Sequence, residues 1–215
     1  MTPILDPVDP VHADASLLVY DKPSGLLAVP GRGPDKQDCL SARAQARYPD
    51  ALIVHRLDMA TSGLMLLARG PEAQRTLSRA FAARAVHKRY IALVAGRLAP
   101  PPEGWGDIDL PILLDWPNRP RRIVDPVQGK PSLTRWRVLG HEGGNTRVEL
   151  EPVTGRSHQL RVHLRALGHP ILGDALYAPT EIQAMAPRLL LHAWTLSLAH
   201  PASGDELRFE SPAPF

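Results

Sequence analysis

Proline and glycine recur so often along this chain, at 23 and 16 of its 215 residues, that most regular elements have to be short. Between these interruptions lie apolar stretches of strand length, LLVYDK at 17–22, GLMLLAR at 63–69 and LLLHAWTLSLA at 189–199. Further strands are predicted at 88–95 and 205–210. Strands and helices are mixed without a regular βαβ alternation, which predicts an α+β fold.

Three helices are predicted from apolar residues at helical spacing. Asp38 would be the N-cap of the first helix, which ends before Pro49. The second helix begins at Pro71, a residue type favoured in the first turn. The third helix spans 157–167, and Gly168 ends it.

The stretch 99–131 differs from the rest because its prolines are clustered, in APPPEG and DLPILLDWPNRPRR. We interpret it as a connection that passes between two lobes, which would meet near 99–131, with one short strand near 106–110. Residues 132–139 and 145–152 flank GHEGGN and alternate well enough for a hairpin. We expect one domain over residues 1–215.

Charge is distributed unevenly along the chain, although the formal net charge is only +3. Residues 41–98 carry a balance of +7 and residues 119–165 a balance of +6, whereas the segments around them are acidic. Two basic blocks are typical of a protein with one electropositive face that attracts a polyanion such as nucleic acid. Scattered, solvated surface charge is the alternative, and the charge pattern leaves both open.

Three observations concern the compartment. No apolar run approaches the ~20 residues that span a bilayer. The N-terminus, MTPILDPVDPVHADAS, has three aspartates and no Lys or Arg, so we expect neither a secretory signal nor a transit peptide. The single cysteine, Cys39, excludes an internal disulfide and a multi-cysteine metal site. We therefore expect a cytoplasmic protein without a membrane partner.

The most unusual segment is HRLDMATSG at 55–63, where charged residues stand beside the apolar runs ALIV and GLMLLAR. A carboxylate such as Asp58 next to a core needs a cation or several hydrogen-bond donors, because burying it unpaired costs several kcal/mol. One interpretation is a catalytic carboxylate at the edge of a sheet. The other is a turn aspartate with a structural arginine partner.

Two further segments could carry chemistry. In TGRSHQLR at 154–161, Arg156 stands just before a predicted helix and could bind a carboxylate or a phosphate, or be solvated. In HKRY at 87–90, Tyr90 could pack in the core or stack on a base. Metal-ligand spacing, a phosphate-binding loop, a GxGxxG motif and a serine nucleophile elbow are all missing, which leaves a carboxylate as the strongest candidate nucleophile.

Six stretches carry a resemblance to a known family, and they occur in this order: DKPSGLLAVPG (21–31), HRLDMATSGLMLLAR (55–69), KRYIALV (88–94), GRSHQLRVHL (155–164), GHPILGDALY (168–177) and RLLLHAW (188–194). Together they resemble the RluA family of pseudouridine synthases, over nearly the whole chain from about residue 16. The specific motif HRLDxxTSG is complete. Ser157 stands where many members have Thr, and we expect no consequence.

The resemblance is greatest to one subgroup of this family. We expect no S4-like RNA-binding domain of the kind that many members carry, and the chain has DWPNRP at 115–120 and MAPRLLLHA at 185–193. In these features it resembles the short, dual-specificity members that act on a 23S rRNA hairpin and a tRNA anticodon stem-loop. Alternatives are a synthase with another tRNA or rRNA target, and a non-catalytic RNA-binding relative. A glycoside hydrolase is less favoured, because only one carboxylate stands out.

The resemblance also implies a fold, a reaction and a set of site residues. The fold is a mostly antiparallel central sheet in two lobes, with flanking helices and an RNA-binding cleft. In the reaction, the target uridine is flipped out of the RNA stack and isomerised to pseudouridine. This reaction needs no cofactor or metal. We expect a monomer. Asp58 would be the catalytic nucleophile or base, and the substrate-binding residues would be Arg56, Tyr90, Arg156 and Leu191.

Overall fold

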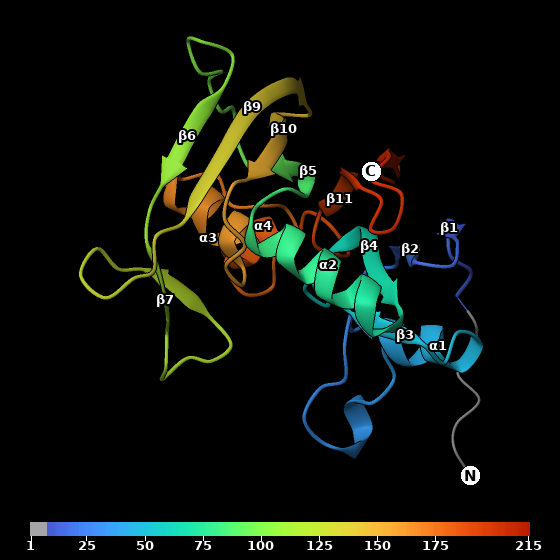
Figure 1. Cartoon of the computed structure of the whole chain (residues 1–215). Helices are drawn as coiled ribbons and strands as arrows, with labels where there is room; N and C mark the ends of the chain where they lie inside the picture. Colours follow the sequence, from blue (N-terminus) through green and yellow to red (C-terminus); the bar gives the residue numbers. More distant parts are fainter. Residues whose placement is uncertain (1–7) are drawn as a thin grey trace. The chain divides into compact units, whose positions relative to one another are not determined.

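The computed structural model describes residues 8–215. Residues 1–7, part of the segment in which we expect no targeting signal, lie outside the described residues. The chain divides into two compact units (Figure 1). The first contains the chain up to His87 together with Ala193–Ala213, and the second contains Lys88–His192 and the last two residues. Within residues 8–215, no helix is long and apolar enough to cross a membrane.

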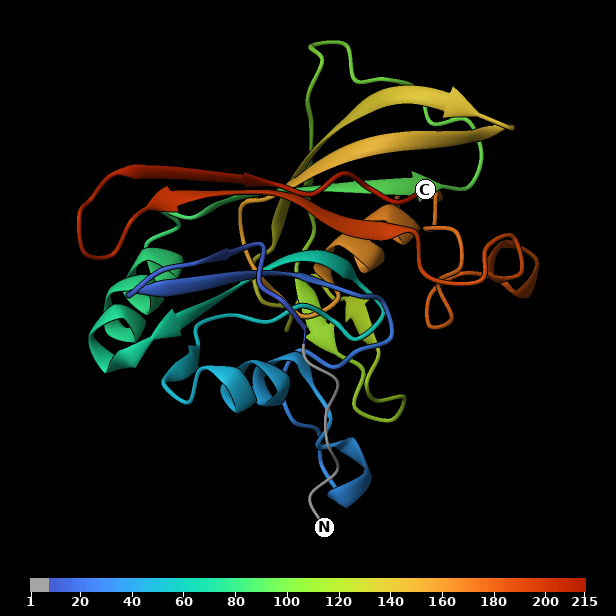
Figure 2. The same ribbon diagram turned by 90° about the vertical axis from the view of Figure 1, so that its right-hand side faces the viewer.

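The first unit is built on a sheet in which β2 (Leu17–Lys22), β4 (Ser62–Arg69) and β11 (Leu191–Ala199) are the longest strands. The strand order is β1-β2-β4-β11, with β1 formed by His12–Ala13. In addition, β3 (Ala51–Ile53) pairs with β4. Figure 2 shows β11 and β12 (Glu206–Glu210) as a red hairpin whose strands pair antiparallel.

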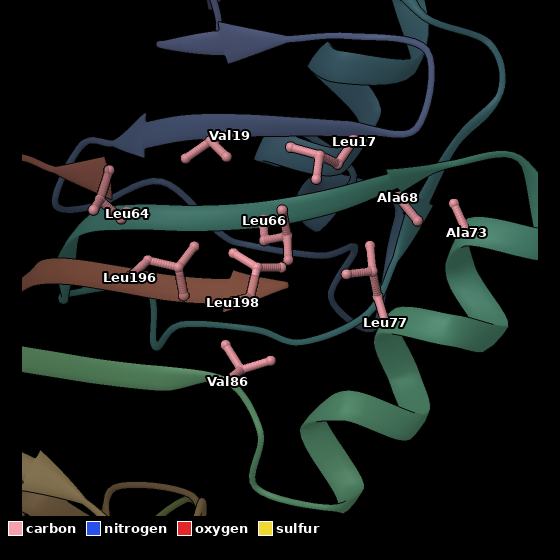
Figure 3. Packing of buried hydrophobic residues seen from close by; sticks show 10 residues of the cluster. All are labelled: Leu17, Val19, Leu64, Leu66, Ala68, Ala73, Leu77, Val86, Leu196 and Leu198. Atoms are coloured by element: carbon pink, nitrogen blue, oxygen red, sulfur yellow. The ribbon is translucent and has the colours of Figure 1, made fainter. Parts of the chain in front are cut away.

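Helix α2 (Gly70–Ala82) covers part of this sheet and follows β4 directly. Its residues Ala73 and Leu77 are buried against Leu17, Leu66 and other apolar side chains of the sheet. Figure 3 shows this cluster between α2 and the strands β2, β4 and β11. The prediction of a buried strand followed by an amphipathic helix is therefore confirmed.

Helix α1 (Leu40–Arg47) forms where expected, but the predicted N-cap is wrong. Cys39 occupies the N-cap position, and its Sγ accepts a hydrogen bond from the Ala42 N–H at 3.4 Å. The Asp38 carboxylate instead accepts two hydrogen bonds from the Arg43 guanidinium, at 2.7 and 2.8 Å. A bidentate guanidinium is a stronger partner for a carboxylate than one backbone N–H, which explains the difference. A 3₁₀ turn, η1 (Pro34–Lys36), precedes this region.

Tyr20 in β2 gives a prediction about stability. Its side chain is fully buried, and within residues 8–215 its Oη is the one buried side-chain oxygen or nitrogen without a hydrogen-bond partner. Burial raises the pKa of this hydroxyl to about 12. Tyr20→Phe removes an unsatisfied polar atom, so we expect the free energy of unfolding to rise by about 1 kcal/mol in urea titrations. A loss of more than about 1 kcal/mol would mean that the hydroxyl has a partner in solution.

The second unit contains an antiparallel sheet in the order β5-β10-β9-β6. Its long strands are β5 (His87–Val94), β9 (Leu133–Glu142) and β10 (Asn145–Pro152), and β6 is Gly106–Asp109. The predicted hairpin at β9 and β10 is confirmed, and its turn is only Gly143–Gly144, both with positive φ. Helix α3 (Gln159–Ala166) packs on this sheet, and α4 (Thr180–Gln183) is a single turn.

The segment 99–131 lies wholly in the second unit, so it does not connect the two units as predicted. Its prolines lie in the loops before, between and after three short strands. Because no proline lies within these strands, their backbone N–H groups can pair with neighbouring strands. Strand β6 pairs with β9, and β7 (Ile112–Leu114) pairs with β8 (Arg122–Val124). The chain passes between the units at His87–Lys88 and again within β11. With antiparallel pairings and few helices, the α+β prediction is confirmed.

Candidate active site

Asp58 lies in the loop between β3 and β4, the segment that the sequence analysis singled out. Its side chain is half-buried, whereas its neighbour Leu57 is buried in the core at 5% exposure. The Asp58 carbonyl accepts a hydrogen bond from the Thr61 N–H at 3.1 Å, which closes a turn immediately before β4. Arg56, two residues earlier, is exposed. The loop thus places a carboxylate and a cation before the start of a strand, β4, that is buried up to its last residue.

His55 fixes the beginning of this loop. Its Nε2 accepts a hydrogen bond from the Leu66 N–H at 2.9 Å, so Nδ1 carries the proton of the neutral ring. The imidazole is stacked on the Phe81 ring of α2 at a centroid distance of 4.6 Å. This histidine is therefore an anchor between the loop, β4 and α2.

Lys22 fixes the other side of the loop from the end of β2. This side chain is fully buried, and Nζ donates hydrogen bonds to the carbonyl oxygens of Pro23, Leu26 and Met59 at 2.8, 2.8 and 3.1 Å. Burial lowers the pKa of Lys22 to about 8, and the charge of Asp58 acts in the opposite direction. A buried cation therefore lies within the field of Asp58, as a carboxylate beside a core requires.

The Pro-Ser-Gly turn after Lys22 is bonded to the same loop. The Gly25 N–H donates to the Met59 carbonyl at 2.8 Å, and Ser24 Oγ donates to the Ala60 carbonyl at 2.7 Å. At the start of β4, Gly63 has φ 107°, and a Cβ there would lie 2.3 Å from the Ala193 carbonyl oxygen. The backbone around Asp58 is thus held from three directions before any substrate binds.

The burial of Lys22 predicts a pH dependence of stability. Its pKa is about 8 in the folded protein and 10.5 in the unfolded chain, so the unfolded state binds more protons between these values. The free energy of unfolding gained from this group therefore rises with pH in that window, by at most about 1.4 kcal/mol per pH unit. In urea unfolding between pH 7.5 and 10.5, Lys22→Met should lack this rise. A constant difference between wild type and variant would contradict the prediction.

Arg156 lies in the second unit, in the loop between β10 and α3. Gln159, which is 3% exposed, holds this loop: its Oε1 accepts from the Arg156 N–H at 3.0 Å and from Thr154 Oγ1 at 2.7 Å. Its Nε2 donates to the Leu133 carbonyl at 3.0 Å. The Arg156 side chain is exposed, and its Nε donates to the Pro131 carbonyl at 3.3 Å. The backbone of Arg156 is therefore fixed, and its guanidinium keeps further donors available.

Tyr90 lies in β5 opposite Leu150 of β10 and is half-buried. Its neighbour Arg89 forms ion pairs with Glu149 at 2.9 Å and Glu151 at 3.6 Å. Because successive side chains of a strand point to opposite faces, the Tyr90 ring points away from this ion-pair network. Leu191, at the start of β11, is buried at 3% exposure.

The structure brings the predicted site residues into two groups. Arg56 and Asp58 share one loop of the first unit, and Tyr90, Arg156 and Leu191 belong to the second unit. Sequence reasoning missed the residues that hold these two loops, namely Lys22, His55 and Gln159. Their signals are weak in a sequence: a lysine at the end of an apolar strand, a histidine before an arginine, and a glutamine in the first turn of a helix.

Comparisons with known proteins decide the family. The sequence model described as RNA pseudouridylate synthase matches residues 16–166. This chain belongs to the RNA pseudouridylate synthase family. The resemblance to RluA synthases is confirmed, and the protein is an RNA pseudouridine synthase, an isomerase. The individual roles of Asp58, Arg56, Tyr90, Arg156 and Leu191 stay predictions.

Relatives in this family are similar over nearly their full length. The dual-specificity RNA pseudouridine synthase RluA of Escherichia coli K12 is 50% identical over 206 residues, which cover 95% of this chain and 93% of the relative. The enzyme of the same name from Pasteurella multocida is 48% identical and covers 100% of this chain and 97% of its own. The structure of human RNA pseudouridylate synthase domain containing 1 superposes with a TM-score of 0.79 at 31% identity, covering 100% of this chain and 87% of that chain.

Proposed function

We propose that this synthase has dual specificity and isomerises specific uridines in a 23S rRNA hairpin and in tRNA anticodon loops, as a cytoplasmic monomer. The observation that carries the proposal is the 50% identity, over 95% of the chain, to an RluA enzyme whose name states dual specificity. The complete HRLDMATSG segment, held by hydrogen bonds to Lys22 and by His55, supports a catalytic rather than a binding-only role.

The reaction is an isomerisation in which the bond between uracil and ribose moves from N1 to C5. The N1–C1′ bond of uridine breaks, the uracil turns, and a C5–C1′ bond forms; C5 loses its proton and N1 gains one. Atoms and electrons balance without an oxidant, reductant or energy source, so we propose that no cofactor is used. Asp58 supplies the essential carboxylate, as a nucleophile or as a base.

The other predicted site residues contact either the Asp58 carboxylate or the target nucleotide. We propose that Arg156 pairs with Asp58, keeps it ionised and orients it. The Tyr90 ring packs against the target uracil, and Leu191 forms the apolar side of its pocket. Arg56, exposed beside Asp58, fills the space that the uridine leaves when it turns out of the stack.

A target within an RNA loop suits this arrangement. A base inside a stacked helix is out of reach, and flipping it costs a few kcal/mol, least where it is already unpaired. Anticodon loops and rRNA hairpin loops present such bases. The basic balances of residues 41–98 and 119–165 would supply the phosphate contacts.

The test uses two transcripts, a tRNA anticodon stem-loop and a 23S rRNA hairpin, each incubated with the wild-type protein. Pseudouridine is mapped by carbodiimide labelling and primer extension. A protein-dependent stop in both RNAs is the expected result. A stop in one RNA alone would refute dual specificity. Binding of both RNAs without a stop, in these and in total tRNA and rRNA, would favour a non-catalytic RNA-binding relative.

A further inference from the structure

The DWPNRP segment at 115–120 forms the tip of the hairpin built by β7 and β8 (Figure 1 labels β7). Residues 116–121 are all exposed, and the Trp116 side chain is exposed to 65%. At this position the ring buries little apolar area, so it contributes little to the stability of the core. Tryptophan is enriched in binding surfaces relative to the rest of a protein surface.

Backbone and side-chain hydrogen bonds hold the tip in one conformation. The Asp115 N–H donates to the Arg121 carbonyl at 3.1 Å, and the Arg121 N–H donates to the Asn118 carbonyl at 3.0 Å. Asn118 Nδ2 donates to both carboxylate oxygens of Asp115, at 3.1 and 3.0 Å. The entropy of ordering this tip is therefore already lost before a ligand arrives.

One arginine lies against the exposed ring, and two more follow it in the sequence. The Arg119 guanidinium lies 4.1 Å from the centroid of the Trp116 ring. Arg121 and Arg122 follow, and none of these three arginines forms an ion pair with a carboxylate within residues 8–215. The one acid among residues 115–122, Asp115, is hydrogen-bonded to the Asn118 amide and not paired with an arginine. With three arginines and one aspartate, the tip therefore presents an aromatic face with a net positive charge.

Trp105, elsewhere in the same unit, also has arginines near its ring, and it provides a comparison for Trp116. Arg89, Arg135 and Arg137 lie 4.9 to 5.6 Å from its ring centroid. Each of these arginines has a carboxylate partner, from Glu149, Glu151 or Asp107. The charges around Trp105 are thus compensated within the fold, and those around Trp116 are not.

The base of the hairpin is tied to the loop that carries Arg156. Ile112 is buried with Val162 of α3 and with Tyr177. The Arg122 N–H donates to Tyr177 Oη at 2.8 Å, and this oxygen is also hydrogen-bonded to His158 Nδ1 at 2.6 Å. His158 follows Arg156 by two residues. The exposed tip is therefore a rigid extension of the same framework that positions a predicted substrate-binding residue.

We propose that Trp116, backed by Arg119, is a stacking platform for an unpaired base of the RNA loop that contains the target uridine. An aromatic face with unpaired guanidinium groups is the chemistry that binds single-stranded nucleic acid: the ring stacks on a base and the cations contact phosphates. The inference rests on the proposed function and deepens it, because it names a residue that sets affinity for the RNA loop.

The experiment compares Trp116→Ala and Trp116→Phe with Val127→Ala, a change at an apolar side chain of the same region that is 88% exposed. Stacking on one base corresponds to about 1–3 kcal/mol, so Trp116→Ala should raise KM and Kd for both stem-loops by about 5- to 150-fold, with a smaller effect on kcat. Trp116→Phe, which keeps an aromatic ring, should retain most of the wild-type affinity. The KM and Kd of Val127→Ala should stay within about two-fold of the wild-type values. 2-Aminopurine at unpaired loop positions should be quenched by wild type and not by Trp116→Ala.

Separate readouts distinguish the possible failures. Thermal unfolding of each variant checks that the fold is intact, and a fully paired RNA of equal length should bind wild type and Trp116→Ala alike. Pseudouridine formation by wild type with equal KM and Kd for Trp116→Ala would overturn the stacking platform and leave the proposed function standing. Absence of pseudouridine with wild type would overturn the proposed function itself.

Discussion

Asp58→Asn should abolish pseudouridine formation while leaving RNA affinity within a few-fold of wild type. The amide keeps the size of the side chain but cannot act as nucleophile or base, so we expect turnover to fall by at least about 10³-fold. Affinity is retained because phosphate contacts dominate RNA binding. Single-turnover assays at saturating RNA, with filter binding in parallel, measure the two quantities separately.

The matched control is Asp50→Asn, which also changes an aspartate of the first unit. Asp50 pairs with Arg69 at 3.1 Å on the surface and takes no part in the proposed site. This variant should keep wild-type turnover. Full activity of Asp58→Asn would contradict the catalytic assignment, and an equal loss in both variants would point to a general effect on the fold.

Asp174→Ala should be the most destabilising of the substitutions considered. Arg161 donates to the two carboxylate oxygens of Asp174 at 2.8 and 2.6 Å, and the side chains are only 5% and 1% exposed. Asp174 Oδ1 also accepts from the backbone N–H groups of Leu176 and Tyr177. Removing the carboxylate takes both of these hydrogen bonds from the buried Arg161 guanidinium, and breaking a buried ion pair in this way costs about 3–5 kcal/mol in urea unfolding.

The exposed pair of Asp38 and Arg43 provides the comparison. It has the same bidentate geometry, at 2.7 and 2.8 Å, but its side chains are 47% and 20% exposed. Asp38→Ala should therefore cost less than about 1 kcal/mol. Similar costs for the two variants would mean that burial does not decide the strength of these pairs.

The sequence predicted the parts of the fold that depend on local pattern. The apolar run at 63–69 and the stripe through Ala73 and Leu77 correspond to β4 and α2, because both patterns are uninterrupted. Two predictions about the fold were wrong, and each has its own physical reason. Asp38 has an N-cap residue type at a suitable position, but its carboxylate binds the Arg43 guanidinium instead of a backbone N–H. The prolines of 99–131 separate short strands within the second unit, and this segment does not connect the two units.

The candidate site could be predicted only in part. Asp58 stands out because a charged segment between two apolar runs is unusual, whereas the pattern around Tyr90 leaves a core role and a stacking role open, and Leu191 is identified through the family resemblance alone. Lys22 and Gln159 were not identified, since their roles depend on contacts to carbonyl and amide groups far along the chain, Met59 and Leu133 among them. Such contacts are set by tertiary packing and leave no periodic signal.

Loss of the proton from C5 of uridine is the most direct measure of the central claim. The two stem-loops, labelled with tritium at C5 of uridine, are incubated with the wild-type protein in EDTA, without nucleotide. We predict tritium release from both RNAs, approaching one equivalent per modified uridine, with a pseudouridine stop at the same position. Tight binding of both RNAs with no tritium released from either would contradict the assignment of this chain as a dual-specificity, cofactor-free pseudouridine synthase.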